Sequence, residues 1–298
     1  DDARIEDAGP VRATLAVSGG FCDDGKRLPI IFKATISLYA SSGLLELDFG
    51  LRNPMAAAHP GNLWDLGDIG SFCFNDLTVA LHPKSDVLGL LWQAEAESEL
   101  HQQGSGPWSL YQDSSGGESW NSGNHVGADG RLTVKFRGYR VRSETGSAAS
   151  SNGLRASPVV AAETGLGLLA VAVDKFWQKF PKAQRCQDGV LGIALFPHES
   201  EGCHELQGGE RKRHLIRCAF GSSQEMKDLQ AMREPVRVAI DPDWVEHSGA
   251  LLHFVAPHAS ESERYNVYVE SVIEGPNSFF ENREVIDEYG WRNFGEVY

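Results

Sequence analysis

The sequence has few positive charges for its size. Its 298 residues include 27 lysines and arginines against 41 aspartates and glutamates, which gives a formal net charge of -14. Proteins that bind nucleic acids or anionic membranes contact phosphates through clustered Lys and Arg. The run 211–213 (RKR) is too short to form such a surface. We therefore expect neither nucleic acid nor a membrane as a partner.

Long hydrophobic runs are absent as well. The longest nearly apolar stretch, residues 165–173, has about half of the ~20 residues that a membrane-spanning helix needs. Neither end of the sequence has the pattern of a signal peptide. With 41% hydrophobic residues, the chain is expected to fold as one large globular domain or as two.

Cysteine is sparse and widely spaced. The five cysteines form no C-x-x-C pair, which argues against zinc and thioredoxin-like sites. Cys186 and Cys203 could form one disulfide. Because the number of cysteines is odd, at least one thiol stays free or pairs outside the chain, so the cysteines do not indicate a compartment.

Short apolar runs separated by Gly, Asp and Ser are abundant. In residues 44–51 apolar side chains alternate with polar residues or glycine, a period of two that is typical of a half-buried strand. Similar runs predict strands at 11–17, 30–39, 132–141, 167–173, 191–196, 214–220, 236–240, 251–255 and 266–273. We therefore predict an all-β protein, a large two-sheet antiparallel β-sandwich over residues 10–280.

Helical patterns are few. Ser222 and Glu225 can form a capping box that opens a helix at 223–233, and Pro235 ends it. A second short helix is expected from about Glu281. The sandwich should therefore carry one or two short helices.

Three polar segments break the alternating pattern: 52–70, 111–127 and 198–210. Connecting segments carry function more often than strands do. Because 52–70 and 111–127 both concentrate glycine, polar groups and single aromatics, we expect them to lie on one side of the sandwich and to form one site.

Several of these segments resemble the rhamnogalacturonan exolyase-like polysaccharide lyases. The resemblance rests on LRNPMAAAHPGNLWDLGDIGS (51–71), YQDSSGGESWNSGNH (111–125), FRGYR (136–140), FWQKFPKA (176–183), HELQGGERKRH (204–214) and EYGWRNFG (288–295). Members of that family have a RIFT-barrel N-terminal domain, a central supersandwich-like β-domain and a C-terminal α/α toroid. The resemblance implies that this chain is the central domain.

The same resemblance implies boundaries and a function. Residues 1–9 would be a linker from a missing domain, and 281–298 would begin a missing helical toroid, the partner of the sandwich within one parent protein. The implied activity is β-elimination of a uronate-containing acidic polysaccharide, rhamnogalacturonan- or ulvan-like, in an extracellular or periplasmic location. The chain alone is expected to have little turnover.

A lyase of this kind must neutralise a uronate carboxylate, remove the C5 proton and protonate the leaving oxygen. His125 is the candidate base, because it lies in a Gly/Asn/Ser loop that water and substrate are expected to reach. The alternative is a loop histidine that only bonds neighbouring backbone.

Tyr139 and Arg140 are the other catalytic candidates. Because side chains alternate along a strand, Arg140 should share a face with Phe136 and Tyr139 should lie on the opposite, basic face. That basic face suits a polyanion. For Arg140 the alternative is a buried ion pair with Asp113 or Glu118.

Substrate contacts are expected from the polar segments. The rings of Tyr111 and Trp120 can stack on sugar or pack in the core. The candidate substrate-binding residues are His59, Trp64, Tyr111, Gln112, Glu118, Trp120 and Asn124.

No cofactor is expected. Asp65 and Asp68 beside His59 could bind Ca²⁺, yet more acids would make a firmer pattern and the Gly/Pro content explains this loop equally well. In HELQGGE, Gly208 occupies the place of the second histidine of H-E-x-x-H, which excludes a zincin site.

Two functions compete with the lyase. One is a noncatalytic carbohydrate-binding or scaffold module, which needs no complete catalytic constellation. The other is a glycoside hydrolase that uses Asp113 and Glu118 as paired carboxylates, whose separation in space decides the matter.

Overall fold

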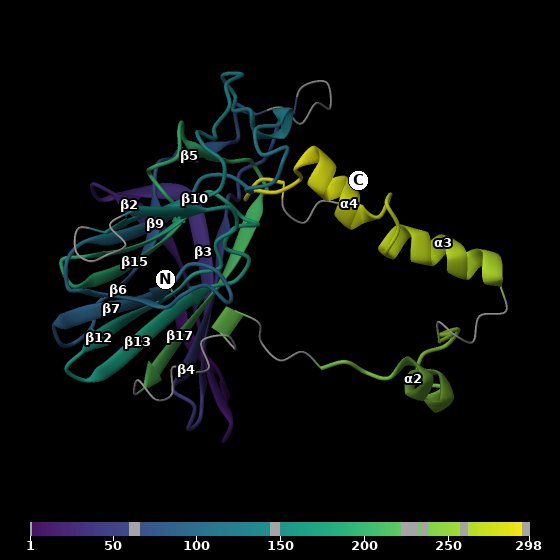
Figure 1. Ribbon diagram of the computed structural model, residues 1–298, viewed down its shortest axis with the longest axis horizontal. Coiled ribbons are helices and arrows are strands. Elements are labelled where there is room, and N and C mark those ends of the chain that lie inside the picture. The colour runs from purple at the N-terminus through teal and green to yellow at the C-terminus, as the bar shows by residue number, and fades with distance from the viewer. Residues whose placement is uncertain are drawn as a thin grey trace.

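Two antiparallel β-sheets packed face to face form most of the molecule (Figure 1). The computed structural model describes residues 2–59, 66–143, 150–221, 232–233, 238–256 and 262–293. Helices α2 (Pro242–Ser248), α3 (Glu263–Ile273) and α4 (Phe279–Ile286) lie beside the two layers. The predicted two-sheet antiparallel sandwich is confirmed.

The larger sheet has nine strands, and chain neighbours lie side by side through most of it. In spatial order the strands are β1 (Asp2–Ala8), β2 (Arg12–Asp23), β3 (Lys26–Tyr39), β4 (Leu44–Arg52), β17 (Arg211–Gly221), β13 (Gly167–Val173), β12 (Val159–Thr164), β7 (Val87–Gln93) and β8 (His101–Gly104). Alternation decides which side chains face inward: His214, Ile216 and Cys218 of β17 are buried at every second position.

The smaller sheet has six strands and covers the inner face of the larger one. Its spatial order is β11 (Ser150–Gly153), β10 (Tyr139–Ser143), β9 (Trp108–Gln112), β14 (Lys182–Gln187), β15 (Val190–Phe196) and β6 (Leu77–Leu81). The turn into β10 requires Gly138, whose φ of 80° is left-handed and whose added Cβ would collide with the carbonyl oxygen of Gly153.

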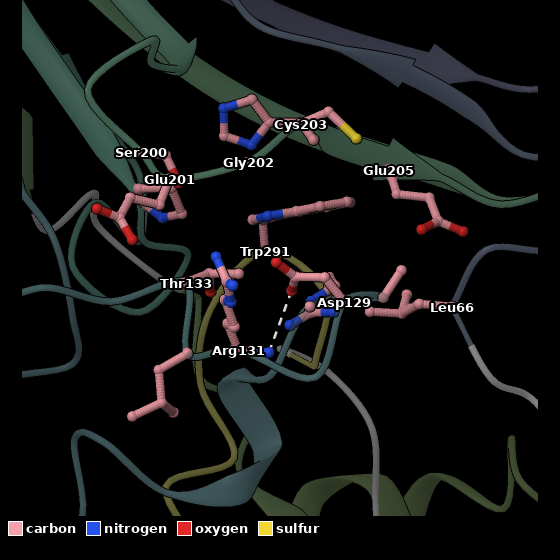
Figure 2. Close-up of a pocket in the computed structure, with 16 residues that line it drawn as sticks. Leu66, Asp129, Arg131, Thr133, Ser200, Glu201, Gly202, Cys203, Glu205 and Trp291 are labelled. Atoms are coloured by element: carbon pink, nitrogen blue, oxygen red, sulfur yellow. Dashed lines mark hydrogen bonds between the residues drawn. The ribbon is translucent and has the colours of Figure 1, made fainter.

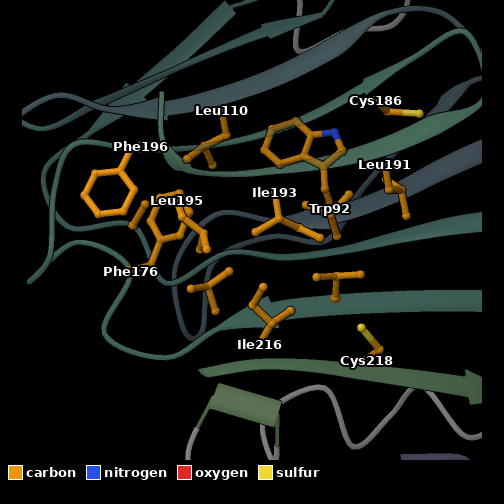
Figure 3. Packing of buried hydrophobic residues seen from close by; sticks show 14 of the residues in the cluster. Trp92, Leu110, Phe176, Cys186, Leu191, Ile193, Leu195, Phe196, Ile216 and Cys218 are labelled. Carbon is orange, nitrogen blue, oxygen red and sulfur yellow. The ribbon is translucent and has the colours of Figure 1, made fainter. Parts of the chain in front are cut away.

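The core lies between the two sheets (Figure 3). Trp92 and Ile216 from the larger sheet pack in the same buried cluster as Leu110 and Ile193 from the smaller one, and each is at most 2% exposed. Burying a side chain of this size stabilises the fold by roughly 1.5–3 kcal/mol. This continuous cluster fixes the relative position of the sheets, and so of the loops at their ends.

Polar side chains also lie inside this core. Lys182 donates from Nζ to the carbonyl oxygen of Leu195 at 3.0 Å. Burial keeps the pKa of Lys182 and that of His214 well below their usual values. The His214 imidazole is therefore uncharged at neutral pH, and burial favours the neutral form of Lys182.

A third, two-stranded sheet pairs β5 (Phe72–Phe74) with β16 (His204–Leu206). We call it the β5–β16 ribbon. The buried Asn53 amide donates to the carbonyl oxygens of Gly70 at 2.8 Å and Leu206 at 2.9 Å. These bonds tie the loop after β4 to the ribbon.

Helix α3 occupies residues for which a strand was predicted at 266–273. That prediction is wrong. The β-branched residues there favour a strand locally, but the Ser262 side chain accepts a hydrogen bond from the backbone N–H of Tyr265 and caps a helix. Helix α4 confirms the short helix expected near Glu281.

Three further predicted strands differ from the structure. Of the predicted strand 132–141, only residues 139–141 belong to a strand, β10. Residues 251–255 form a turn followed by irregular chain that pairs with no strand, and residues 238–240 form no strand either. Residues 236–237 lie outside the described residues, as does the predicted helix 223–233 except for residues 232–233, which are helical. Among the described residues, the sandwich strands end at Gly221.

The start of the chain is part of the sandwich. Strand β1 pairs antiparallel with β2, with Asp2 opposite Ser18 and Ala8 opposite Ala13. Residues 2–8 therefore form an edge strand where a linker was expected.

After α4 the chain returns to the sandwich through residues 287–293, which we call the C-terminal turn. The fully buried Asp287 accepts from Ser115 Oγ at 2.5 Å and lies 2.6 Å from Nε2 of His125. The backbone N–H of Trp291 donates to the carbonyl oxygen of Phe180 at 2.9 Å. These bonds hold Trp291 against the end of the sandwich.

Candidate functional site

A pocket of about 580 Å³ opens between the C-terminal turn, residues 127–133 and the β5–β16 ribbon (Figure 2). Its volume falls in the range of ~300–1,000 Å³ that is usual for small-molecule sites. Leu66 and Gly127 both line it, so the polar segments 52–70 and 111–127 each contribute a residue to the pocket. The third polar segment contributes residues 200–205.

A tight turn shapes the rim on one side. Gly127 donates from its backbone N–H to the carbonyl oxygen of Arg131 at 2.8 Å, and the Arg131 N–H donates to Asp129 Oδ1 at 3.1 Å. Gly130 supplies the left-handed conformation with a φ of 75°. The exposed side chains of Asp129 and Arg131 therefore stand next to each other at the pocket.

Trp291 forms an aromatic wall of the pocket. Figure 2 shows its ring between Asp129 and Arg131 on one side and Cys203 and Glu205 on the other. The ring is 8% exposed and meets Phe196 edge to face at 5.2 Å. A ring held in this way gives the pocket a fixed apolar surface.

Glu205 anchors the opposite side. Its Oε1 accepts from the Gly67 N–H and from Ser71 Oγ, both at 2.7 Å. Burial lowers the pKa of Arg292, while the charges of Glu205 and Glu210 oppose that shift. Arg292 also donates to the carbonyl oxygen of Val126 at 3.1 Å.

His204 is an uncharged polar group in the pocket lining. Because a carbonyl only accepts, the ring donates from Nε2 to the carbonyl oxygen of Pro197 at 3.0 Å, which leaves Nδ1 as an acceptor. Burial lowers the pKa of His204 to about 4. The imidazole is therefore neutral at physiological pH.

The remaining charges lie at the rim. Glu201 pairs with Lys135 at 3.4 Å, and their side chains are 61% and 41% exposed. Such an exposed pair contributes little to stability, about 0–1 kcal/mol, and exchanges easily for a ligand. The pocket therefore combines an aromatic wall, carboxylates and guanidinium groups, a set suited to hydroxyl-rich ligands and to proton transfer.

His125 lies elsewhere, in the short helix η2 (Gly123–His125). It is 3% exposed, bonded to Asp287, and packed edge to face against Phe180 at 5.0 Å. The prediction that water and substrate reach His125 is wrong. Asp287, which is far away in the sequence, covers this histidine. Its carbonyl oxygen accepts from the Thr133 N–H, so the residue helps to position the rim turn.

Tyr139 and Arg140 point to opposite faces of β10, as predicted. Tyr139 is 6% exposed, and burial followed by a hydrogen bond to Glu95 raises the pKa of its hydroxyl. Arg140 is exposed, with its guanidinium carbon 3.9 Å from the ring centroid of Phe136. It therefore stacks on a ring and forms no buried ion pair with an acid.

The side chains of Tyr111, Gln112 and Asp113 form hydrogen bonds within the protein, so their role is structural. Tyr111 donates to Asp113 at 2.7 Å, and the other oxygen of that carboxylate accepts from two backbone N–H groups. The Gln112 amide donates to the carbonyl oxygen of Leu154 at 2.8 Å. Burial raises the pKa of Asp113.

The other candidates in this segment hold the chain together. Glu118 is exposed and pairs with Arg137 at 2.5 Å, so it and the buried Asp113 lie in different surroundings. Trp120 packs against the cluster that contains Phe180. The Asn124 amide donates to the carbonyl oxygen of Ile286 at 2.7 Å.

The loop after β4 is organised by Asp68. Its carboxylate accepts from the N–H groups of Ala58 at 3.0 Å, His59 at 2.8 Å and Gly70 at 2.9 Å. These bonds lower the pKa of Asp68. Trp64 and Asp65 lie outside the described residues.

Two negative findings concern the described part of the chain. It contains no group of three or more His, Cys, Asp or Glu residues placed to hold a metal ion. None of its helices is long and apolar enough to cross a membrane.

Several residues that build the pocket were not identified from the sequence. Trp291 and Arg292 were assigned to the start of a toroid, and Asp129 and Arg131 lie just beyond the polar segment 111–127. The A-D-G turn at 128–130 was the available signal, because it presents charged side chains at the end of a segment already singled out.

No known protein family matches the sequence, and no curated protein matches it. Among solved structures, a candidate aldose 1-epimerase from Klebsiella pneumoniae is similar at 9% identity and a TM-score of 0.39, over 80% of this chain and 59% of that one. A galactose mutarotase related enzyme from Lactobacillus acidophilus gives 13% identity and a TM-score of 0.32, over 80% and 74%. A galactose mutarotase-like protein from Lactobacillus casei gives 9% and 0.34, over 74% and 73%.

These neighbours are described as sugar epimerases and mutarotases, whereas the sequence resemblance was to polysaccharide lyases. The chain spans 59% of the length of the Klebsiella protein. The scores are too low to carry an assignment, so function is argued from the pocket itself. The assignment to the rhamnogalacturonan exolyase-like family, and with it the lyase activity, is wrong.

Proposed function

We propose that the chain is a sugar-binding enzyme and that the pocket beside Trp291 holds the sugar. The observation that supports this most is the combination of one fixed aromatic wall with charged side chains in a pocket of about 580 Å³. The apolar face of a sugar ring packs on an aromatic ring, while its hydroxyl groups need donors and acceptors around the edge.

Each part of the pocket has a role in this proposal. Trp291 is the stacking surface, and Asp129 and Arg131 on the rim turn bind hydroxyl groups. Glu205 and Arg292 are held by backbone and side-chain bonds, so they keep the shape of the site. The ligand is a single sugar unit or the end of a short chain.

The enzymatic part of the proposal is proton transfer on the oxygens of the bound sugar. Asp129 and Glu201 are exposed carboxylates at the pocket, and His204 is a neutral imidazole with Nδ1 as acceptor. A carboxylate and an imidazole can exchange a proton with a hydroxyl group at neutral pH. Interconversion of sugar anomers is the simplest reaction of this class.

Binding is tested by calorimetric titration of the full chain with neutral and acidic monosaccharides. We expect Trp291→Ala to weaken binding about tenfold or more, since ~1.4 kcal/mol corresponds to a factor of ten. The matched control is Trp244→Ala, which removes a 66% exposed tryptophan of α2 far from the lining. Because Trp291 also packs on Phe196, Arg131→Ala on the exposed rim gives a second test that leaves the core intact.

Catalysis is tested separately by polarimetry of anomer interconversion with the sugar that binds. We expect Asp129→Asn or Glu201→Gln to reduce the acceleration by about 10²–10⁴-fold, the range of general acid–base groups. Binding without acceleration would make the chain a binding module. Unchanged affinity in both Trp291→Ala and Arg131→Ala would place the sugar site elsewhere.

A further inference from the structure

Two cysteines lie close together at the β5–β16 ribbon. Cys73 is the middle residue of β5 and lies opposite Glu205 of β16. Cys203 directly precedes β16, two residues from Glu205, so Cys203 and Cys73 belong to the same face of the ribbon. Because Cys203 lies just outside the ladder, its backbone is not fixed by strand pairing.

The two thiols lie diagonally opposite each other on one face of the ribbon and are accessible to solvent. Both side chains are exposed, and both cysteines are free. Cys73 is nevertheless partly desolvated by its surroundings, which raises the pKa of its thiol to about 12, and the neighbouring Cys203 adds to this rise. This influence of Cys203 agrees with the strand register, which makes the two cysteines diagonal neighbours across the ribbon.

The other cysteines differ from this pair. Cys186 is 2% exposed in the core, so the disulfide between Cys186 and Cys203 that the sequence allowed is not present. Cys218 is also buried, and Cys22 is exposed on β2. Cys22 therefore provides an internal comparison for an accessible thiol.

We infer that Cys73 and Cys203 form a reversible disulfide when the protein meets a low-molecular-weight disulfide. The pair joins β5 to the turn that leads into β16. The inference depends on the ribbon alone and does not rest on the binding of a sugar.

The exchange proceeds in two steps. The Cys203 thiolate attacks one sulfur of the small disulfide, its S–S bond breaks, and one small thiolate leaves. Cys73 then loses its proton to solvent and attacks Sγ of Cys203, which releases the second small thiolate. Two protein thiols are oxidised to one disulfide, and one small disulfide is reduced to two thiols. Cys203 reacts first because the raised pKa keeps Cys73 protonated.

Oxidation would act on the wall of the pocket. Cys203 lines the pocket together with its neighbours His204 and Glu205 (Figure 2). A covalent bond to β5 fixes the position of this edge relative to Ser71, which already bonds to Glu205. The pocket would then have a more rigid edge in the oxidised protein than in the reduced one.

The test incubates the folded, reduced chain with glutathione disulfide and maps the products by mass spectrometry after blocking free thiols. We expect one peptide pair cross-linked through Cys73 and Cys203, with Cys22 carrying glutathione as a separate adduct. In Cys73→Ser, glutathione should remain on Cys203 because the resolving thiol is gone. Cys22→Ser should leave the cross-link unchanged.

A second measurement uses no variant. Phenylarsine oxide, which bridges two neighbouring thiols, should bind the reduced chain at one site and should not bind after treatment with glutathione disulfide. Stable separate glutathione adducts on Cys73 and Cys203 would overturn the inference. So would a wild-type chain in which both thiols stay free while Cys22 reacts.

Discussion

At the scale of single residues, Asp287 joins the C-terminal turn to the segment 111–127, although the sequence did not single it out. It follows α4 with a φ of 56° and is fully buried. Its carboxylate is hydrogen-bonded to Ser115 and to His125, both from the segment 111–127. One carboxylate therefore connects the C-terminal turn to the sandwich.

We predict that Asp287→Ala lowers the free energy of unfolding by about 3–5 kcal/mol, because it leaves a buried serine and histidine without their partner. The measurement is urea denaturation followed by tryptophan fluorescence. Glu118→Ala is the matched control in the same segment; it removes an exposed ion pair with Arg137 and should cost about 0–1 kcal/mol. Equal losses in the two variants would contradict the anchoring role.

The residues around Asp287 show why the site was not predictable from the sequence. Side-chain alternation correctly placed Tyr139 and Arg140 on opposite faces, since that follows from strand geometry alone. The burial of His125 depends on a partner 162 positions away, and local pattern contains no information about such a contact. The same holds for Trp291, whose ring neighbours Phe196 and His204 are both far away in the sequence.

At the scale of elements, the helices after Gly221 depend on their caps more than on packing. Helices α3 and α4 have no buried residues and expose apolar side chains such as Tyr268 and Phe280. Helices of this length are marginal in water without tertiary support. Each helix begins with a serine whose side chain accepts from the third residue beyond it.

We predict that Ser278→Ala loosens α4 by about 1 kcal/mol, the usual value of an N-cap bond. Ser278 Oγ accepts from the Glu281 N–H at 3.2 Å, and the residue is 2% exposed. Amide hydrogen exchange should therefore be about fivefold faster in α4, since 1 kcal/mol corresponds to roughly that factor.

The control for this helix is Ser271→Ala, which changes an exposed serine within α3 whose hydroxyl donates to the Tyr268 carbonyl. It should leave exchange in α4 unaltered. If Ser278→Ala also leaves α4 exchange unaltered, the cap does not limit the stability of this helix.

The strand pattern was informative for the sandwich and misleading beyond it. A period of two identified the runs that became β2, β3, β4, β13 and β17, because a half-buried sheet imposes that period. In 266–273 the valine-rich composition indicated a strand, yet no neighbouring strand is available there and the Ser262 cap favours a helix. The composition of a segment does not show whether another strand is available to pair with it.

At the scale of the whole molecule, buried uncharged histidines make stability depend on pH. Burial lowers the pKa of His204 to about 4 and holds that of His214 well below its usual value. In the unfolded chain both titrate near ~6.5, so between that pH and the folded pKa the unfolded state binds more protons. Stability is therefore fully present above pH ~6.5 and is lost as the pH falls.

We predict that the free energy of unfolding decreases by about 2 kcal/mol between pH 7 and pH 5 from His204 alone, with a further decrease from His214. Most carboxylates stay ionised over this interval, so the loss belongs to the histidines. The test is the midpoint of urea denaturation measured at several pH values. In His204→Gln this midpoint should depend less steeply on pH. The same midpoint at pH 7 and pH 5 would contradict the prediction.

The long stretch of sequence between Gly221 and Trp291 affects the folding of the nascent chain. Synthesis proceeds from the N-terminus at ~5–20 residues per second, and domains fold as they emerge. The last sandwich strand among the described residues ends at Gly221, whereas the aromatic wall of the pocket arrives only after α2, α3 and α4 have been made. On the ribosome, a growing chain therefore spends several seconds with the two sheets of its sandwich complete and the aromatic wall of its pocket still to be made.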